Sequence, residues 1–135
     1  MIVVDANILF YLHVRGDQTQ LAEKVYERDS DWFAPALWRS EFRNALALYL
    51  RRGKLNMERS LDAMQRAERL MQGRELDVAS VVVLKLAADS GGFAYDCEYV
   101  SLAQDLGVPL VTADADLLSR FGTTAVSMQA FCSKK

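Results

Sequence analysis

Residues 2–7 read Ile-Val-Val-Asp-Ala-Asn, a short β-branched run that meets an aspartate and then an asparagine. Such a run is typical of a buried strand in a parallel sheet. A similar passage, Leu-Val-Thr-Ala-Asp, occupies residues 110–114. Elsewhere short apolar runs alternate with helical patterns, which predicts an α/β fold with a central, mostly parallel sheet. No linker or repeat interrupts the pattern, so we expect a single domain over residues 1–135.

The individual elements are predicted from periodicity and from the residues that begin and end them. We expect strands at residues 2–4, 32–34, 108–111 and 125–126. We expect helices at residues 8–14 (capped by Asn7), 18–28, 35–52 (starting on Pro35), 81–88, 95–106 and 114–121, and a short one at the C-terminus. Asn56 is expected to cap a further helix. Residues 81–88 are apolar nearly all round, so strand and helix compete there by periodicity, and the helix propensity of Leu84 to Ala88 favours a helix. Leu61, Met64 and Met71 are expected to point inward.

Composition is that of a globular protein, with 51% hydrophobic and 25% charged residues in a chain of 135. The formal net charge is -2, so binding to nucleic acid would need a local basic face. Residues 38–74 offer one, because they hold nine basic and four acidic residues. This segment is either a solvated helical face or a ridge that contacts phosphates. Arg39 and Arg43 are the better candidates for contacts with the phosphates of a nucleic acid because they flank Glu41 on one helix.

Cys97 and Cys132 form neither a disulfide framework nor a metal-binding pattern. No secretory signal is visible, and no apolar run approaches the roughly 20 residues of a membrane helix. We therefore expect a cytoplasmic protein without a membrane segment.

Five acidic residues occupy positions of interest: Asp5, Glu41, Asp96, Asp114 and Asp116. The carboxyl ends of parallel strands line the ligand crevice of an open sheet, which directs Asp5 and Asp114 to the same edge. Clustered carboxylates repel one another unless protons or cations neutralise them. Mg²⁺ and Mn²⁺ suit such oxygen ligands, and these ions promote hydrolysis of phosphodiesters.

Each acid also has a simpler structural interpretation. Asp5, Asp114 and Asp116 suit helix caps or turns, and Asp96 suits the first turn of a helix. Glu41 is harder to explain in this way because it borders an apolar helical stripe. Residue spacing alone leaves both interpretations open.

Four segments, in order, resemble the motifs of the PIN-domain nucleases. They are Val-Val-Asp-Ala-Asn at 3–7, Pro35 followed by Glu41, Tyr-Asp-Cys-Glu-Tyr-Val-Ser-Leu-Ala at 95–103, and Leu-Val-Thr-Ala-Asp-Ala-Asp-Leu at 110–117. The small size resembles the VapC-type toxins of bacterial and archaeal toxin–antitoxin pairs. The resemblance implies a three-layer α/β/α sandwich and an endoribonuclease that depends on Mg²⁺ or Mn²⁺.

The resemblance also implies a role for each matching residue. Asp5, Glu41, Asp96 and Asp114 match the acidic catalytic quartet, and Asp116 matches an additional acid of the metal site. Asn7 and Thr112 match polar residues that hold the acids in place. The implied partners are an RNA substrate and a cognate antitoxin that covers the acidic pocket. A homodimer is expected as well, because the helices carry more apolar residues than one core needs: Trp38, Leu48, Tyr49, Leu50, Leu61, Met64, Leu70 and Met71.

Other functions fit the sequence less well. A phosphatase with a strand-end aspartate nucleophile would need a second acid at the position of Asn7. A receiver-like phosphoacceptor would leave Glu41 without a role. A non-catalytic protein–protein module of the same fold would not need the full quartet. A housekeeping nuclease without an antitoxin stays open.

Overall fold

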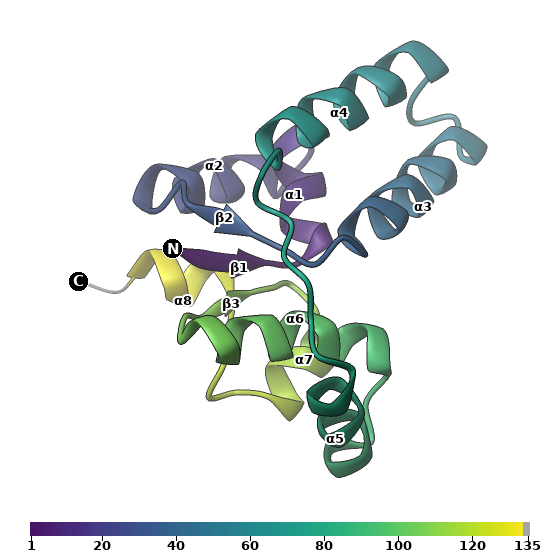
Figure 1. The fold of residues 1–135 in the computed structure, drawn as a ribbon. Helices are drawn as coiled ribbons and strands as arrows, with labels where there is room; N and C mark the ends of the chain where they lie inside the picture. The colour runs from purple at the N-terminus through teal and green to yellow at the C-terminus, as the bar shows by residue number, and fades with distance from the viewer. Residues whose placement is uncertain (134–135) are drawn as a thin grey trace.

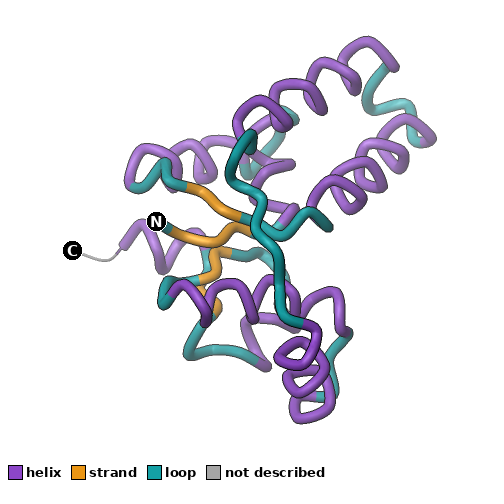
Figure 2. Tube along the Cα trace, in the orientation of Figure 1, coloured by secondary structure: helices purple, strands orange, loops and turns teal. Residues whose placement is uncertain are grey.

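The structure is a computed structural model that describes residues 1–133. Its centre is a sheet of four short parallel strands in the order β2-β1-β3-β4 (Figures 1 and 2). The strands are β1 (Ile2–Val4), β2 (Trp32–Phe33), β3 (Leu110–Val111) and β4 (Ala125–Val126). All carboxyl ends therefore meet at one edge of the sheet.

Helices fill the connections, as the alternating pattern predicts. They are α1 (Ala6–His13), α2 (Thr19–Arg28), α3 (Trp38–Arg51), α4 (Met57–Leu70), α5 (Ser80–Ser90), α6 (Ala94–Leu106), α7 (Ala115–Arg120) and α8 (Met128–Ser133). The expected helix at residues 81–88 is confirmed as part of α5. Gly91 and Gly107 follow α5 and α6 with left-handed backbones, which glycine adopts without strain.

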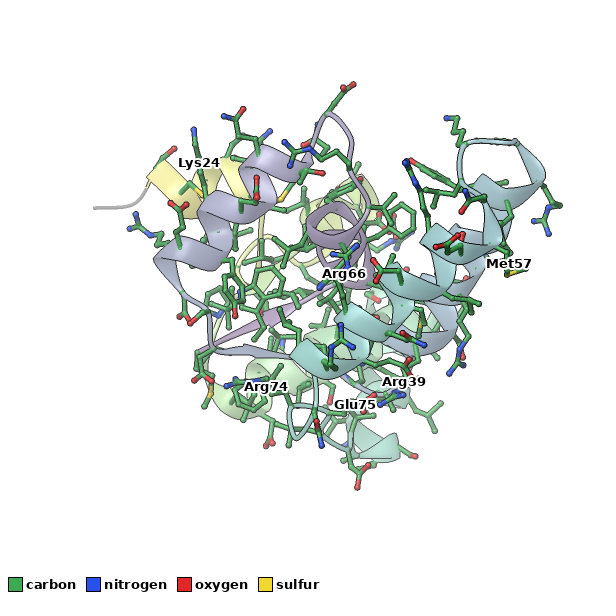
Figure 3. The ribbon with its side chains drawn as sticks, turned by 90° about the horizontal axis from the view of Figure 1, so that it is seen from above. Lys24, Arg39, Met57, Arg66, Arg74 and Glu75 are labelled. Carbon is green, nitrogen blue, oxygen red and sulfur yellow. The ribbon has the colours of Figure 1, made fainter. Side chains whose placement is uncertain are left out.

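The helices form layers on the two faces of the sheet. Helix α6 packs on β1 and β3, and α2 contacts both α1 and α8. Figures 1 and 3 show α6 on one face and α1, α2 and α8 on the other. This arrangement confirms the three-layer α/β/α architecture. No described helix is long and apolar enough to span a membrane.

The buried core joins the sheet to the first turns of α3 and to α6. Its largest fully buried side chains include Trp32, Trp38, Tyr99 and Phe42. Cys97 is buried as well, as expected of a small apolar side chain. Burial of these aromatic rings fixes the base of α3 and the inner face of α6 against the sheet, and both helices carry acidic residues of interest.

Helices α3 and α4 form an antiparallel pair that projects beyond the sheet (Figure 1). Gly53 provides the turn with a positive φ of 68°, and the Asn56 side chain caps α4 by accepting a hydrogen bond from the Arg59 backbone N–H. The chain after α4 crosses the sheet to reach α5, and Glu75 forms a parallel bridge with Ala34 on the way. We call α3, α4 and the turn between them, residues 38–70, the arm.

Three details of the predicted helices are wrong. Asn7 lies inside α1, whose N-cap is Asp5. The Asp5 carboxylate accepts a hydrogen bond from the Ala6 backbone N–H at the start of the helix, so the helix begins before Asn7. Pro35 precedes α3 by a turn, and the helix begins at Trp38. Leu61 points outward with 54% of its surface exposed, whereas Met64 and Met71 are buried as expected. The inward face of α4 is instead completed by the small residues Ala63 and Ala67.

Candidate active site

Asp5 stands where β1 ends, at the centre of the sheet edge. Its backbone N–H donates to the carbonyl of Val111 at 3.0 Å, which fixes it beside the end of β3. Its carboxylate is buried and accepts hydrogen bonds from the Ala6 N–H at 2.7 Å, the Thr112 hydroxyl at 2.7 Å and the Asn7 amide at 3.3 Å. Three donors therefore hold this carboxylate in one orientation.

Thr112 connects the two strand ends. Its hydroxyl donates to Asp5 and accepts from the Asp114 backbone N–H at 3.0 Å. Asn7 makes a second link, because its side-chain oxygen accepts from the Ala113 N–H at 3.4 Å. The Asp114 carboxylate in turn caps α7 by accepting from the Asp116 N–H at 2.8 Å. Asp5 and Asp114 are thus both helix caps and neighbours in one network.

Glu41 reaches the same site from the first turn of α3. The buried hydroxyl of Tyr99, on α6, donates to Oε1 of Glu41 at 2.6 Å. Tyr99 lies in the segment 95–103 that resembles a PIN motif, but the sequence alone assigned it no partner, although a buried tyrosine hydroxyl usually finds one. That rule could have predicted that the Tyr99 hydroxyl has a hydrogen-bond partner, although it could not have identified Glu41 as the partner.

Asp96 completes the group from the first turn of α6. It does not act as the cap, because the N-cap position belongs to Phe93, which makes no side-chain capping bond. Asp5, Glu41, Asp96 and Asp114 line one pocket of about 660 Å³. The structure therefore gathers the four predicted acids from four separate segments of the chain.

Burial and repulsion by neighbouring charges raise the pKa of Asp5, Glu41 and Asp96. Burial raises the pKa of Asp5 to about 6, against the hydrogen bonds from Thr112 and Ala6 and with the help of repulsion by Asp96 and Asp114. Burial likewise raises the pKa of Glu41 to about 7, although the Tyr99 hydrogen bond lowers it. The pKa of Asp96 is raised by burial and then by the charges of Asp114 and Asp116. Such a site favours the binding of cations.

The donor set suits a hard divalent cation. Mg²⁺ commonly binds one or two carboxylates and keeps several waters, and the pocket offers oxygen ligands and room for water. Within residues 1–133 no group of three or more His, Cys, Asp or Glu side chains is arranged to hold a metal ion directly. It is the chemistry of the four carboxylates that suits an ion which keeps most of its waters.

Sequence comparison identifies the family. A family model described as "PIN domain" matches residues 2–122. The chain belongs to the PIN domain family. It is also similar to a protein named Ribonuclease VapC3 from Pyrobaculum aerophilum, with 26% identity over 123 residues, 89% of this chain and 94% of that protein.

The fold of this PIN domain is similar to a solved structure. The crystal structure of PAE2754 from Pyrobaculum aerophilum superposes with a TM-score of 0.78 and 23% identity, covering 97% of this chain and 92% of that one. At this identity the likeness supports the fold, and it agrees with the layers described above.

Other candidate residues of the PIN domain lie outside the pocket lining. Arg39 pairs with Glu75, in the chain after α4, through Nε at 2.7 Å and Nη2 at 2.8 Å (Figure 3). It also pairs with Glu68 of α4 at 2.7 Å. Arg43 is exposed on the same helix as Arg39. Asp116 accepts a hydrogen bond from Arg120 at 2.8 Å on the surface of α7. The structure thus gives Arg39 and Asp116 protein partners.

The pocket also has a wall of apolar and aromatic side chains between α1 and α3, which the sequence did not identify. It includes Phe10, Tyr11, Leu48 and Tyr49, and Tyr95 adds a further ring beside Asp96. Spacing could not reveal this wall, because it combines residues from three helices.

Proposed function

We propose that this PIN domain is a metal-dependent endoribonuclease of the VapC toxin type. The observation that carries the proposal is the convergence of Asp5, Glu41, Asp96 and Asp114 on one pocket. The similarity to a protein named Ribonuclease VapC3 supports RNA as the substrate. The residues that hold the ion would be Asp5, Asp96 and Asp114, with Asp116 as an additional acid.

The side chains of the chain have separate tasks in this mechanism. Thr112 and Asn7 hold the Asp5 carboxylate in place, and Tyr99 holds Glu41. A bound Mg²⁺ or Mn²⁺ would neutralise the phosphodiester and make a water more acidic. Because the pKa of Glu41 is raised to about 7, its carboxyl group can take up a proton near neutral pH.

The arm provides a basic surface for RNA phosphates. Residues 38–74 carry a net charge of +5, and within residues 1–133 no ion pair involves Arg43, Arg51, Arg52 or Lys54. Arg43 is the first candidate because it is exposed one turn or less from Glu41. Arg39, held by two glutamates, is better placed to stabilise the arm.

The proposed activity is tested by sequencing RNA ends after induced expression. We expect new cleavage ends in cells that express the parent chain and none with Asp114→Asn. Asparagine caps helices as well as aspartate does, so this variant keeps α7 while it loses one charge of the site. Purified parent chain should cleave the same RNA with Mn²⁺ and not with EDTA. Equal cleavage by the parent and the variant would contradict the proposal.

Two protein partners belong to the same proposal. A cognate antitoxin would insert an arginine among the carboxylates, which form a good partner for a guanidinium group.

A homodimer is also proposed, although Trp38, Met64 and Met71 prove to be buried within the chain itself. Helices α4 and α5 carry exposed apolar side chains that could serve such an interface, at Met57, Leu61, Val81, Val82 and Leu84. We place the protein in the cytoplasm, where its RNA substrate is found.

The main alternative is a PIN domain that binds a protein and has no catalytic activity. Its carboxylates would then bind the partner protein and would have no part in catalysis. Cleavage of RNA that requires a divalent ion separates the two functions. A housekeeping nuclease would cleave without any adjacent small protein that inhibits it.

A further inference from the structure

Two exposed aromatic rings stand at the rim of the acidic pocket. Phe93, which precedes α6, is 63% exposed, and Tyr95, in its first turn, is 47% exposed. Among the exposed large hydrophobic side chains of residues 1–133, these two are the aromatic ones. Other aromatic side chains of the described chain, such as Trp32 and Trp38, are buried in the core.

The two rings are stacked on each other. Their centroids lie 5.2 Å apart and their planes differ by 6°, which is a favourable offset-stacked arrangement. Stacking limits the motion of both rings, so the pair presents a flat and pre-formed apolar surface to solvent. A pre-formed surface loses little conformational entropy when a flat ligand binds.

The location of the pair indicates its ligand. Tyr95 lines the pocket together with Asp5, Glu41, Asp96 and Asp114, whereas Phe93 is outside the lining. A phosphodiester held at the carboxylates carries a base on each neighbouring nucleotide. One of these bases would therefore lie within reach of the Tyr95 ring, next to the adjacent residue Asp96.

We propose that Phe93 and Tyr95 form a base-stacking platform that binds one nucleobase of single-stranded RNA beside the scissile phosphate. The base stacks on Tyr95, and Phe93 supports the Tyr95 ring from behind. Every base has an aromatic face, so the platform selects little among base sequences. It favours unpaired RNA over duplex RNA, because only an unpaired base is free to stack on a protein ring. This proposal rests on the proposed nuclease function, because the phosphate at the carboxylates sets the position of the base.

The test measures binding apart from cleavage. Single-stranded RNA octamers that contain 2-aminopurine are titrated with protein in the presence of Ca²⁺, and gels confirm that the RNA stays intact. Stacking quenches 2-aminopurine fluorescence. For the parent chain and for Tyr95→Phe we expect quenching on binding. For Tyr95→Ala we expect the quenching to vanish and Kd to rise about fivefold or more, with a smaller rise for Phe93→Ala.

Leu84→Ala is the matched control, because Leu84 is 64% exposed on the neighbouring helix α5. It should leave both quenching and Kd unchanged. An octamer with an abasic site in place of 2-aminopurine should bind the parent as weakly as the complete octamer binds Tyr95→Ala. The abasic octamer should bind Tyr95→Ala as tightly as it binds the parent, because the contact between base and ring is already lost once the base is removed.

Failure of the platform and failure of the nuclease function give different results. If Tyr95→Ala binds the octamer as the parent does, the platform proposal is overturned even when the parent cleaves RNA. If the parent binds with quenching but never cleaves with Mn²⁺, the nuclease function fails and the platform stands. If Tyr95→Ala instead dissociates a dimer without changing Kd for RNA, the pair is a contact between copies and the proposal is overturned.

Discussion

Asp5 and Glu41 set the pH behaviour that we expect of the pocket. The pKa of Asp5 is raised to about 6 and that of Glu41 to about 7, mainly by burial. An acid whose pKa is higher in the folded state stabilises the fold below its unfolded pKa of about 4. That stability is lost as the pH rises through the folded pKa. Without metal, these two groups therefore make the chain less stable at pH 8 than at pH 5.

Glu41→Gln isolates this effect. The variant cannot ionise at position 41, whereas the parent must accommodate a charge near Asp5, Asp96 and Glu98. We expect the variant to gain about 1–2 kcal/mol over the parent between pH 5 and pH 8, after allowance for solvent screening. Urea unfolding in EDTA at both pH values measures the difference. His13, whose pKa is lowered chiefly by burial, titrates in both proteins and cancels in this comparison.

Tyr99→Phe serves as the control for Glu41→Gln. It removes the hydrogen bond that lowers the pKa of Glu41, so the loss of stability should extend to higher pH than in the parent. If the free energies of unfolding of the parent and of Glu41→Gln change with pH in parallel, Glu41 is not buried among other charges.

Arg39 fastens the base of the arm to the chain that follows α4. It binds both oxygens of Glu75, which also accepts a hydrogen bond from the Trp38 indole at 3.0 Å. These bonds lower the pKa of Glu75. The resulting stability is present above the unfolded pKa of glutamate and is lost as the pH falls through the folded pKa.

Arg39→Ala should destabilise the chain by about 1–2 kcal/mol at pH 7, because it leaves Glu75 and the Trp38 indole with fewer partners. The loss should shrink as the pH falls toward 4. Arg43→Ala, on the exposed side of the same helix, should leave stability within about 0.5 kcal/mol of the parent. Denaturant unfolding measures both. Weaker RNA binding by Arg39→Ala at unchanged stability would instead support the role in RNA binding expected from the sequence.

The sequence predicted the order and type of the elements because most of them carry a strong local signal, and helix propensity decided the ambiguous residues 81–88. The β-branched run of β1 and the glycines after α5 and α6 are examples of such signals. The start of α3 at Trp38 was not predictable in the same way. Pro35 lies in the turn before the helix, and its ring fits that turn as well as a first helical position.

The positions of the acids were predictable from the strand ends and the resemblance, but their contacts were not. The hydrogen bond of Tyr99 to Glu41 joins two residues that are 58 positions apart in the chain. The pairing of Arg39 with Glu75 joins residues 36 positions apart. In each pair the two residues belong to different segments of the chain, so the periodicity of a helix or strand carries no signal for the contact. The Arg39–Glu75 contact arises because the chain crosses the sheet after α4.

Charge divides the molecule into two parts. Residues 38–74 have a net charge of +5 within a chain of net charge -2, and most of this segment is the arm, which projects beyond the sheet (Figure 1). The remainder, which holds Asp5, Asp96 and Asp114, is acidic. A polyanion would therefore be attracted to the arm and reach the carboxylates only with cations present.

The triple variant Arg51→Gln, Arg52→Gln, Lys54→Gln tests the arm. If all three side chains contact phosphates of a single-stranded RNA octamer, the slope of log K against log salt should become less steep by about 2. Lys24→Gln, a single change on α2 away from the arm (Figure 3), should leave the slope unchanged. Fluorescence anisotropy at several salt concentrations gives the slopes. An unchanged slope for the triple variant would identify this end of the arm as a solvated surface.

If the four carboxylates form one cation-binding site, Mn²⁺ should raise the free energy of unfolding of the parent more than that of Asp96→Asn. In EDTA the variant should be at least as stable as the parent, because one of the repelling charges is gone. At a hundredfold excess of Mn²⁺ over Kd the parent should gain about 2.7 kcal/mol, and the variant clearly less. A variant that is about 0.5–2 kcal/mol less stable in EDTA and gains as much from Mn²⁺ as the parent would show that Asp96 is a structural residue outside any cation site.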